Sequence, residues 1–274
     1  MRKPIGPLAY LCLLAAGCVQ ASSPIEHVAG IAPMAADVSA SVDAGQFDAG
    51  TFTASDGTVL PYRVLRPSRL QEGRSYPLVV QFHGSGGIGT DNARQLDPLA
   101  RSWALPDLRE RYQAYVLVPQ FPIRSANYGP ASPDQHSEAS PALVAAIELV
   151  RAFASKHPVD PSRIYATGFS MGGSAAWLAP TLDPALFAAI APISGIAPAD
   201  SRAPAFRTLP VLVFHGNADD ENPITADRRF FAAILKAGGR HIRLREYEGL
   251  AHSPPADIQP GTAWRDWLFR QKRP

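Results

Sequence analysis

The chain has 274 residues, of which 18% are charged and 46% are hydrophobic. This length allows one or two domains with a large apolar core, and the composition excludes a disordered protein. Removing Arg2 and Lys3, which lie in the N-terminal leader, from the 26 basic residues leaves 24 against 24 acidic ones. A nearly neutral chain without a basic patch argues against nucleic acid as a partner.

The first 21 residues have the pattern of an export signal. Arg2 and Lys3 precede an apolar run at 8–16 that is too short to span a bilayer. The sequence L-A-A-G-C then resembles a bacterial lipobox, so we expect Cys18 to be lipidated and to become the mature N-terminus. The alternative is signal-peptidase cleavage after Ala21. The expected location is therefore the cell envelope through a lipid anchor, or else the periplasm or the medium.

The rest of the chain divides into a tether and one domain. Residues 22–45 are rich in Ala, Ser, Pro and Gly without a sustained period, which predicts a flexible tether, although the start of a β element could lie within it. Residues 46–274 form the expected catalytic domain. Because Cys12 and Cys18 both lie in the leader, that domain has no internal disulfide.

Hydrophobic patterns along the domain predict strands separated by helices. A hairpin is expected at 51–53 and 59–65, and Pro61 and Pro67 suggest that its two strands lie at a sheet edge. Further strands are expected at 77–82, 114–118, 164–166, 188–193, 210–214 and 241–247. Helices are expected at 141–156, with Ser140 as the N-cap, then after position 170, at 224–236 and at 262–271.

Continuous apolar strands alternating with helices predict an α/β fold with a mostly parallel central sheet and helices on both faces. Only about 15 residues separate the strands at 188–193 and 210–214, which leaves no room for a large lid. The loop at 121–140 is rich in Pro, Ser, Asn and Gly, and a loop of that length usually serves a site.

The stretch R-I-Y-A-T-G-F-S-M-G-G-S-A at 163–175 predicts a strand, a sharp turn and a helix around Ser170. Glycines two residues before and after a serine suit a turn in which strand and helix close together and leave no room for side chains. Such a turn presents the Ser170 hydroxyl at the end of a sheet. The N–H of Met171, at the start of the helix, would then face a developing oxyanion.

A serine nucleophile needs a base, and His252 follows the last predicted strand, where it would overhang the sheet. His83 and His215 each precede a glycine at a strand end, and we expect them to brace their loops by hydrogen bonding. The remaining histidines are expected to be solvated or to lie in the tether or at the start of a strand: His27, His136, His157 and His241.

The base in turn needs a carboxylate, and an acidic run follows the strand at 210–214. Asp219 is the expected partner, with Asp220 and Glu221 as alternatives. This run lacks the spacing of a calcium loop, and no metal site is predicted. The resulting chain order of serine, acid and histidine is that of α/β-hydrolases.

The Gly-rich turn after the strand at 77–82 is the expected source of the second oxyanion donor. Glycines let the backbone approach a substrate carbonyl, and the N–H of Ser85, or alternatively of Gly86, is the candidate. The turn is not a phosphate cradle because it lacks the Lys and Ser/Thr of a P-loop, and no cofactor is expected.

Two segments resemble a known group. H-G-S-G-G-I-G-T-D-N at 83–92 is similar to the H-G-A-G-E-R-G-x-D-N segment of bacterial α/β-hydrolases described as predicted peptidases or esterases. D-P-S-R-I-Y-A-T-G-F-S-M-G-G at 160–173 resembles their nucleophile segment, which feruloyl and acetylxylan esterases and polyhydroxyalkanoate depolymerases share. The resemblance implies Ser170, Asp219 and His252 as the triad and the turn at Ser85 as the oxyanion hole. Gly87 and Ile88 depart from it by replacing Glu and Arg.

The hypothesis from the sequence is an exported serine esterase that cleaves polymer-borne or aryl esters through an acyl-enzyme. A serine peptidase would use the same residues. A binding protein of the cell envelope that keeps the fold without catalysis is the alternative outside enzymes.

Overall fold

The computed structural model describes residues 23–35, 39, 41–259 and 261–274. The predicted export signal at 1–21, with Cys18, lies outside the described residues. Among the residues that are described, no helix is both long and apolar enough to cross a membrane.

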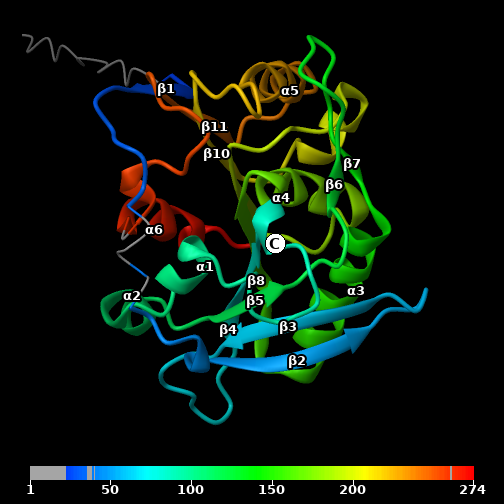
Figure 1. Ribbon diagram of the computed structural model, residues 1–274, viewed down its shortest axis with the longest axis vertical. Helices are drawn as coiled ribbons and strands as arrows, with labels where there is room; N and C mark the ends of the chain where they lie inside the picture. The colour runs from blue at the N-terminus through cyan, green and yellow to red at the C-terminus, as the bar shows by residue number, and fades with distance from the viewer. Residues whose placement is uncertain (1–22, 36–38, 40, 260) are drawn as a thin grey trace, which may run out of the picture.

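A central sheet of nine strands organises the described part of the chain (Figure 1). Its strand order is β1-β11-β10-β9-β8-β4-β5-β3-β2. Neighbours from β1 to β5 in this order are parallel, whereas β3 is antiparallel to both β5 and β2. The strands are β1 Ile25–Val28, β2 Phe47–Thr53, β3 Val59–Leu65, β4 Tyr76–Phe82, β5 Tyr115–Pro119, β8 Val159–Phe169, β9 Ala189–Ile193, β10 Val211–Gly216 and β11 Ile242–Tyr247.

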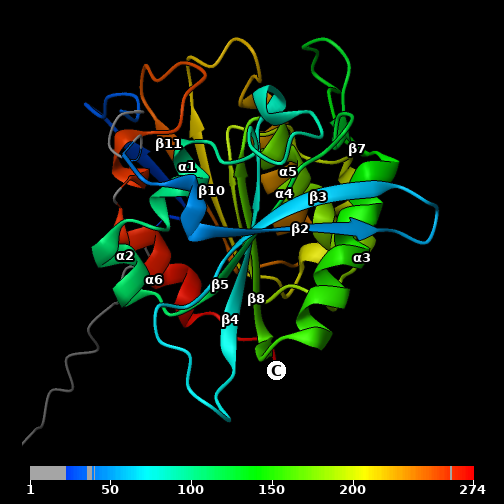
Figure 2. The same ribbon diagram turned by 60° about the horizontal axis from the view of Figure 1, so that its bottom comes forward.

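Helices cover both faces of this sheet (Figure 2). One face carries α1 Pro98–Ser102, α2 Pro106–Arg111 and α6 Thr262–Arg270; the other carries α3 Pro141–Lys156, α4 Met171–Leu182 and α5 Thr225–Lys236. The predicted fold class, a mostly parallel sheet between two layers of helices, is therefore confirmed. The segment between β9 and β10 holds only the short 3-10 helix η4, Asp200–Phe206, and no lid domain.

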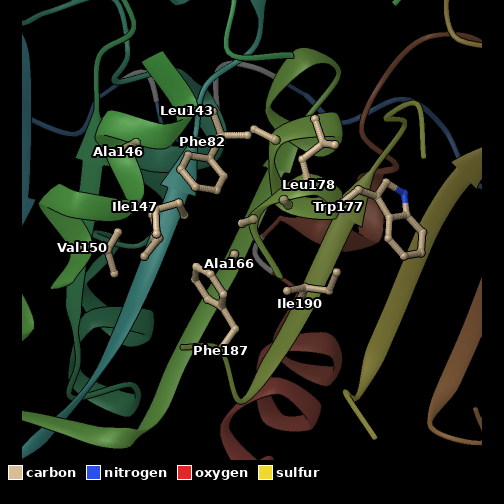
Figure 3. Close-up of a cluster of buried hydrophobic side chains, with 14 of the residues drawn as sticks. Phe82, Leu143, Ala146, Ile147, Val150, Ala166, Trp177, Leu178, Phe187 and Ile190 are labelled. Atoms are coloured by element: carbon tan, nitrogen blue, oxygen red, sulfur yellow. The ribbon is translucent and has the colours of Figure 1, made fainter. Parts of the chain in front are cut away.

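Each face of the sheet packs its own apolar core. On the face of α3 and α4, one cluster of buried side chains includes Leu143 and Val150 of α3, Phe82 of β4 and Trp177 of α4 (Figure 3). On the opposite face, Trp103 and Trp264 stack edge to face with ring centroids 5.5 Å apart. Burial of large aromatic and aliphatic side chains on both faces stabilises this three-layer arrangement.

Within the predicted tether at 22–45, Ile25–Val28 form β1 and pair in parallel with β11 at the edge of the sheet, which agrees with the alternative that a β element begins in this segment. A four-residue strand of mixed polarity has too little periodicity to stand out in a segment rich in Ala and Ser. Its partner lies more than 200 residues away, so no local hairpin signal marks it.

The prediction that the hairpin lies at a sheet edge is confirmed, although β3, which holds Pro61, lies between β2 and β5. The edge strand of the hairpin is β2. Pairing of β3 with β5 begins at Tyr62, so Pro61 lies just beyond that ladder, and its carbonyl accepts the Gln120 N–H at 2.7 Å. A residue without an N–H is tolerated at such a position.

The start of α3 and the loop that precedes it can be compared with the prediction. Ser140 caps α3 by accepting the Leu143 N–H, with Pro141 in the first turn, as predicted. The loop at 121–140 is not wholly irregular, because β6 Ala126–Asn127 and β7 Glu138–Ala139 form a small antiparallel ribbon beside α4.

The turn at Ser170 joins β8 to α4, and the neighbouring glycines are required by space. A Cβ on Gly168 would lie 2.5 Å from the Phe82 carbonyl oxygen, and one on Gly172 would lie 2.2 Å from the same atom. The first turn of α4 thus rests directly on the end of β4, which confirms the steric reason predicted for these glycines.

We expect Gly172→Ala to lower the free energy of unfolding by about 1–3 kcal/mol, because the new methyl group must push the backbone of β4 away. Urea denaturation monitored by tryptophan fluorescence would measure this loss. Gly129→Ala is the matched control, since a Cβ there meets nothing within 4 Å, and it should change stability by less than about 0.5 kcal/mol. Equal stabilities of the two variants would contradict the steric argument.

Candidate active site

Ser170 sits in a strained backbone conformation at the carboxyl end of β8. Its φ of 58° and ψ of −122° are unusual for a residue with a side chain. The Ser170 N–H is held by the Ile193 carbonyl at 3.0 Å, which ties the turn to β9. The hydroxyl group consequently projects beyond the sheet instead of into the core.

His252 lies in the loop after β11 and reaches Ser170. Its Nε2 is 2.8 Å from Ser170 Oγ, and its Nδ1 is 2.8 Å from Asp219 Oδ2. The ring also packs against Phe169, with centroids 4.8 Å apart. Because a carboxylate accepts at Nδ1, the Nδ1–H tautomer leaves the Nε2 lone pair free to accept the serine proton.

Asp219 lies in the turn after β10, and its carboxylate is buried. Oδ1 accepts the Asn222 N–H at 2.8 Å and the Glu221 N–H at 3.1 Å, while Oδ2 faces His252. Burial opposes ionisation, but hydrogen bonds from His215, His252 and the Asn222 backbone outweigh it and hold the pKa of Asp219 well below its usual range. Asp219 is therefore an anion at neutral pH.

The two alternatives for the acid do not make this contact. Asp220 is exposed, and the Glu221 side chain is 72% exposed with Oε2 3.8 Å from His252 Nε2, on the serine side of the ring. The structure thus brings together Ser170, Asp219 and His252 from the ends of three different strands.

The Gly-rich turn after β4 lies next to Ser170. Ser85–Gly87 form a single 3-10 turn, η3, and Ser85 and Gly86 are exposed to the same groove as Ser170 and His252. Met171 is the first residue of α4, so its N–H has no acceptor within the helix. The predicted oxyanion donors therefore border the serine hydroxyl.

The buried ring of His83 holds this turn in place through hydrogen bonds. The buried ring donates Nδ1–H to the Gly84 carbonyl at 2.6 Å, and Nε2 accepts the Phe121 N–H at 3.0 Å. A Cβ on Gly87 would come within 2.5 Å of this ring, so the turn and the imidazole are in tight contact. Burial lowers the pKa of His83 to about 4, and the ring is neutral.

The groove above Ser170 has a volume of about 500 Å³ and is bordered by charged side chains. Arg94 is exposed and pairs with Asp91 at 3.2 Å. Asp97 caps α1 by accepting the Ala100 N–H at 2.8 Å, and burial raises its pKa to about 6 against the effect of that bond. Residues 127–138 of the long loop line a separate hollow of about 670 Å³.

The other predicted histidines lie outside this group. His27, His136 and His241 are exposed, and His157 stacks on Phe153 with ring centroids 4.1 Å apart. In the described residues, no group of three or more His, Cys, Asp or Glu could hold a metal ion.

Asp227 was not predicted from the sequence; it is buried on α5 and accepts Nδ1–H of His215 at 2.8 Å. One signal could have found it. Asp227 lies on the helix face that also buries Ala226, Phe230, Phe231 and Ile234, and a charged residue on an apolar helix face requires a buried partner. His215 braces its loop, as predicted.

The parallel sheet, the strained serine turn and the adjoining imidazole and carboxylate define an α/β-hydrolase. The family model described as "Dienelactone hydrolase family" matches residues 113–261, more than half of the chain. The chain belongs to the dienelactone hydrolase family. No curated protein matches the chain.

Solved structures with the same fold include esterases and a peptidase. A thermostable esterase is similar with a TM-score of 0.74 and 32% identity over 84% of this chain, which spans 64% of that esterase's length. Thermogutta terrifontis esterase 2 has a TM-score of 0.58 and 19% identity, covering 82% of this chain and 92% of its own. Porphyromonas gingivalis dipeptidyl peptidase 4 has a TM-score of 0.61 and 14% identity, covering 82% of this chain and 35% of the peptidase. The last two likenesses show the fold alone.

The neutral state of His83 predicts acid sensitivity. Since its folded-state pKa is about 4 and the unfolded value is about 6.5, only the unfolded chain takes up this proton between those values. The stability that neutral His83 provides is complete above pH 6.5 and is lost as the pH falls, by about 2 kcal/mol at pH 5.

Urea denaturation at pH 7.5 and pH 5 tests this expectation. His83→Gln removes the titrating group, so it should lose about 2 kcal/mol less than the wild type between these two pH values. The raised folded-state pKa of Asp97 increases stability as the pH falls and so opposes the effect of His83, but it does so equally in the wild type and the variant. Equal losses in wild type and variant would show that His83 is not the source.

Proposed function

We propose that the chain is a serine carboxylesterase-type hydrolase in which Ser170 is the nucleophile, His252 the general base and Asp219 the acid. One observation carries the proposal: His252 lies within 2.8 Å of Ser170 Oγ on one side and of Asp219 Oδ2 on the other. A serine hydroxyl becomes an effective nucleophile only beside such a base, and the buried carboxylate keeps the base in the required tautomer.

The first half of the reaction forms an acyl-enzyme. Ser170 Oγ attacks the ester carbonyl while its proton moves to His252 Nε2, and Asp219 stabilises the resulting imidazolium. The N–H of Met171 and that of Ser85, or alternatively of Gly86, stabilise the oxyanion of the tetrahedral intermediate. His252 then gives its proton to the leaving alcohol as the carbon–oxygen bond breaks.

The second half repeats these steps with water. His252 takes a proton from the water that attacks the acyl carbonyl, and then returns a proton to Ser170 Oγ as the carboxylic acid leaves. All groups return to their starting protonation states, so the cycle needs no cofactor.

The proposed substrates are esters carried on a polymer or on an aryl group. The groove at Ser170 is open, and the short connection between β9 and β10 places no domain over it, which suits a bulky alcohol moiety. The resemblance of the serine segment to that of feruloyl and acetylxylan esterases points to the same class. We place the enzyme outside the cytoplasm, with Cys18 as the proposed lipid attachment site.

Peptide cleavage is the second candidate. The same three side chains would serve a serine peptidase, and the described fold is shared with a dipeptidyl peptidase. Ester cleavage is preferred because the structure with 32% identity is that of an esterase.

We expect Ser170→Ala to reduce turnover of p-nitrophenyl acetate by about 10⁴-fold or more, because the variant cannot form an acyl-enzyme. It should also lose labelling by a fluorophosphonate probe. Ser132→Ala, in the exposed loop between β6 and β7, should keep full activity and labelling. A folded wild type that is neither labelled nor active would indicate a binding protein instead of an enzyme.

Substrate class is tested separately with the wild-type enzyme. Turnover of p-nitrophenyl esters without cleavage of aminoacyl anilides supports the esterase, and the reverse supports the peptidase. A panel of acetyl, butyryl and feruloyl esters then identifies the preferred acyl group.

A further inference from the structure

A second imidazole lies behind the carboxylate of Asp219. His215 is the fifth residue of β10 and is fully buried. Its Nε2 is 3.4 Å from Asp219 Oδ2, the same oxygen that faces His252. This oxygen therefore lies between two histidine rings, one on the serine side and one on the core side.

Both ring nitrogens of His215 face acceptors. Nδ1 is 2.8 Å from Asp227 Oδ2, and Nε2 is 2.7 Å from the Asn222 carbonyl oxygen. A carbonyl cannot donate, so Nε2 must carry a hydrogen, and a carboxylate at Nδ1 requires a second one. His215 with both hydrogens is an imidazolium ion.

The surroundings stabilise this buried cation. Asp227 also accepts the Trp177 Nε1–H at 2.9 Å through its other oxygen, so both oxygens of its carboxyl group are hydrogen-bonded. Burial alone would lower the pKa of His215, but hydrogen bonds and charge attraction from Asp219 and Asp227 outweigh it and raise the pKa to about 9. A buried charge is tolerated when it is paired and hydrogen-bonded in this way.

We propose that His215 is a positioning residue of the site that holds a permanent positive charge behind Asp219. This charge fixes the orientation of the Asp219 carboxylate and limits how strongly the negative charge of Asp219 stabilises the protonated form of His252. This inference rests on the proposed function, because it takes His252 as the base. Asp227 is the counter-ion that keeps His215 charged.

Asn222 connects His215 to Asp219 and so fixes the orientation of the Asp219 carboxylate. His215 donates to the Asn222 carbonyl, and the Asn222 N–H donates to Asp219 Oδ1 at 2.8 Å. The Asn222 side chain is itself held by the Ser194 carbonyl at 2.9 Å. The turn that carries the acid is thus connected to the ring of His215 by a continuous chain of hydrogen bonds.

The charge effect is set by three carboxylates around the two rings. Asp227 faces His215 from α5, Asp219 lies between the rings, and Glu221 lies 3.8 Å from His252 at the exposed side. If His215 is replaced by a neutral residue, two buried carboxylates remain without their cation. Their combined negative charge stabilises the protonated form of His252, and catalysis then requires a higher pH.

The test is the pH profile of kcat/KM for p-nitrophenyl acetate in His215→Gln and in the double variant His215→Gln/Asp227→Asn. We expect the acidic limb of His215→Gln to move up by about one pH unit, since the loss of one nearby charge changes a titration by that order. The double variant removes the unpaired carboxylate while keeping Gln at 215. Its acidic limb should return toward the wild-type position.

A merely structural His215 would lower kcat or stability in both variants without moving the limb. An unshifted limb in folded His215→Gln overturns the proposal, as does a shifted limb that the second substitution leaves in place.

The protonation state is also measured directly in the wild type, which removes any dependence on how the variants fold. In ¹⁵N-histidine-labelled protein we expect both His215 nitrogens to show imidazolium resonances throughout pH 6–8. A neutral ring at pH 7 overturns the proposal. If Ser170→Ala keeps its esterase activity, the proposed function fails instead, whatever the state of His215.

Discussion

The strained turn at Ser170 is the constraint on which the rest of the site depends. A positive φ at a serine is stable only where its surroundings fix it, and here β4, β9 and α4 all close on the turn. Gly168 and Gly172 contact the Phe82 carbonyl because β4 and β8 are adjacent in the sheet. That same adjacency places the turn at Ser85 beside the hydroxyl. One steric arrangement thus positions both the proposed nucleophile and its predicted oxyanion donors.

The proposed acid, Asp219, and the proposed base, His252, follow β10 and β11, which are not neighbours of β8 in the sheet. Hydrogen bonds between the loops after β10 and β11 hold these loops together. The Ala218 N–H donates to the Leu250 carbonyl at 3.1 Å, and the Gly249 N–H donates to Asn217 Oδ1 at 2.8 Å. A Cβ on Gly216 would lie 2.1 Å from the Leu250 carbonyl oxygen, so the two loops are in direct backbone contact. The loops that carry Asp219 and His252 are therefore held against each other.

Sequence patterns were sufficient where the signal is local. The cap at Ser140, the apolar strands and the glycines around Ser170 each depend on neighbours within a few residues, and the structure contains them. Patterns were insufficient where a distant partner decides the outcome: β1 forms only because β11 offers a parallel edge. Asp227 belongs to the second kind, since its role depends on a histidine and a tryptophan from other elements.

The proposed charge arrangement around Asp219 links this distant contact to the chemistry. Before proton transfer, His215 and Asp227 form a neutral pair, and Asp219 contributes one net negative charge beside neutral His252. When His252 accepts the serine proton, Asp219 lies between two imidazolium ions, and Asp227 supplies the second negative charge that balances them. Without Asp227 the buried group would gain an uncompensated positive charge during the reaction, which a low-dielectric interior disfavours strongly. A carboxylate on the buried apolar face of α5 thus becomes, in this proposal, a condition for His252 to take up a proton.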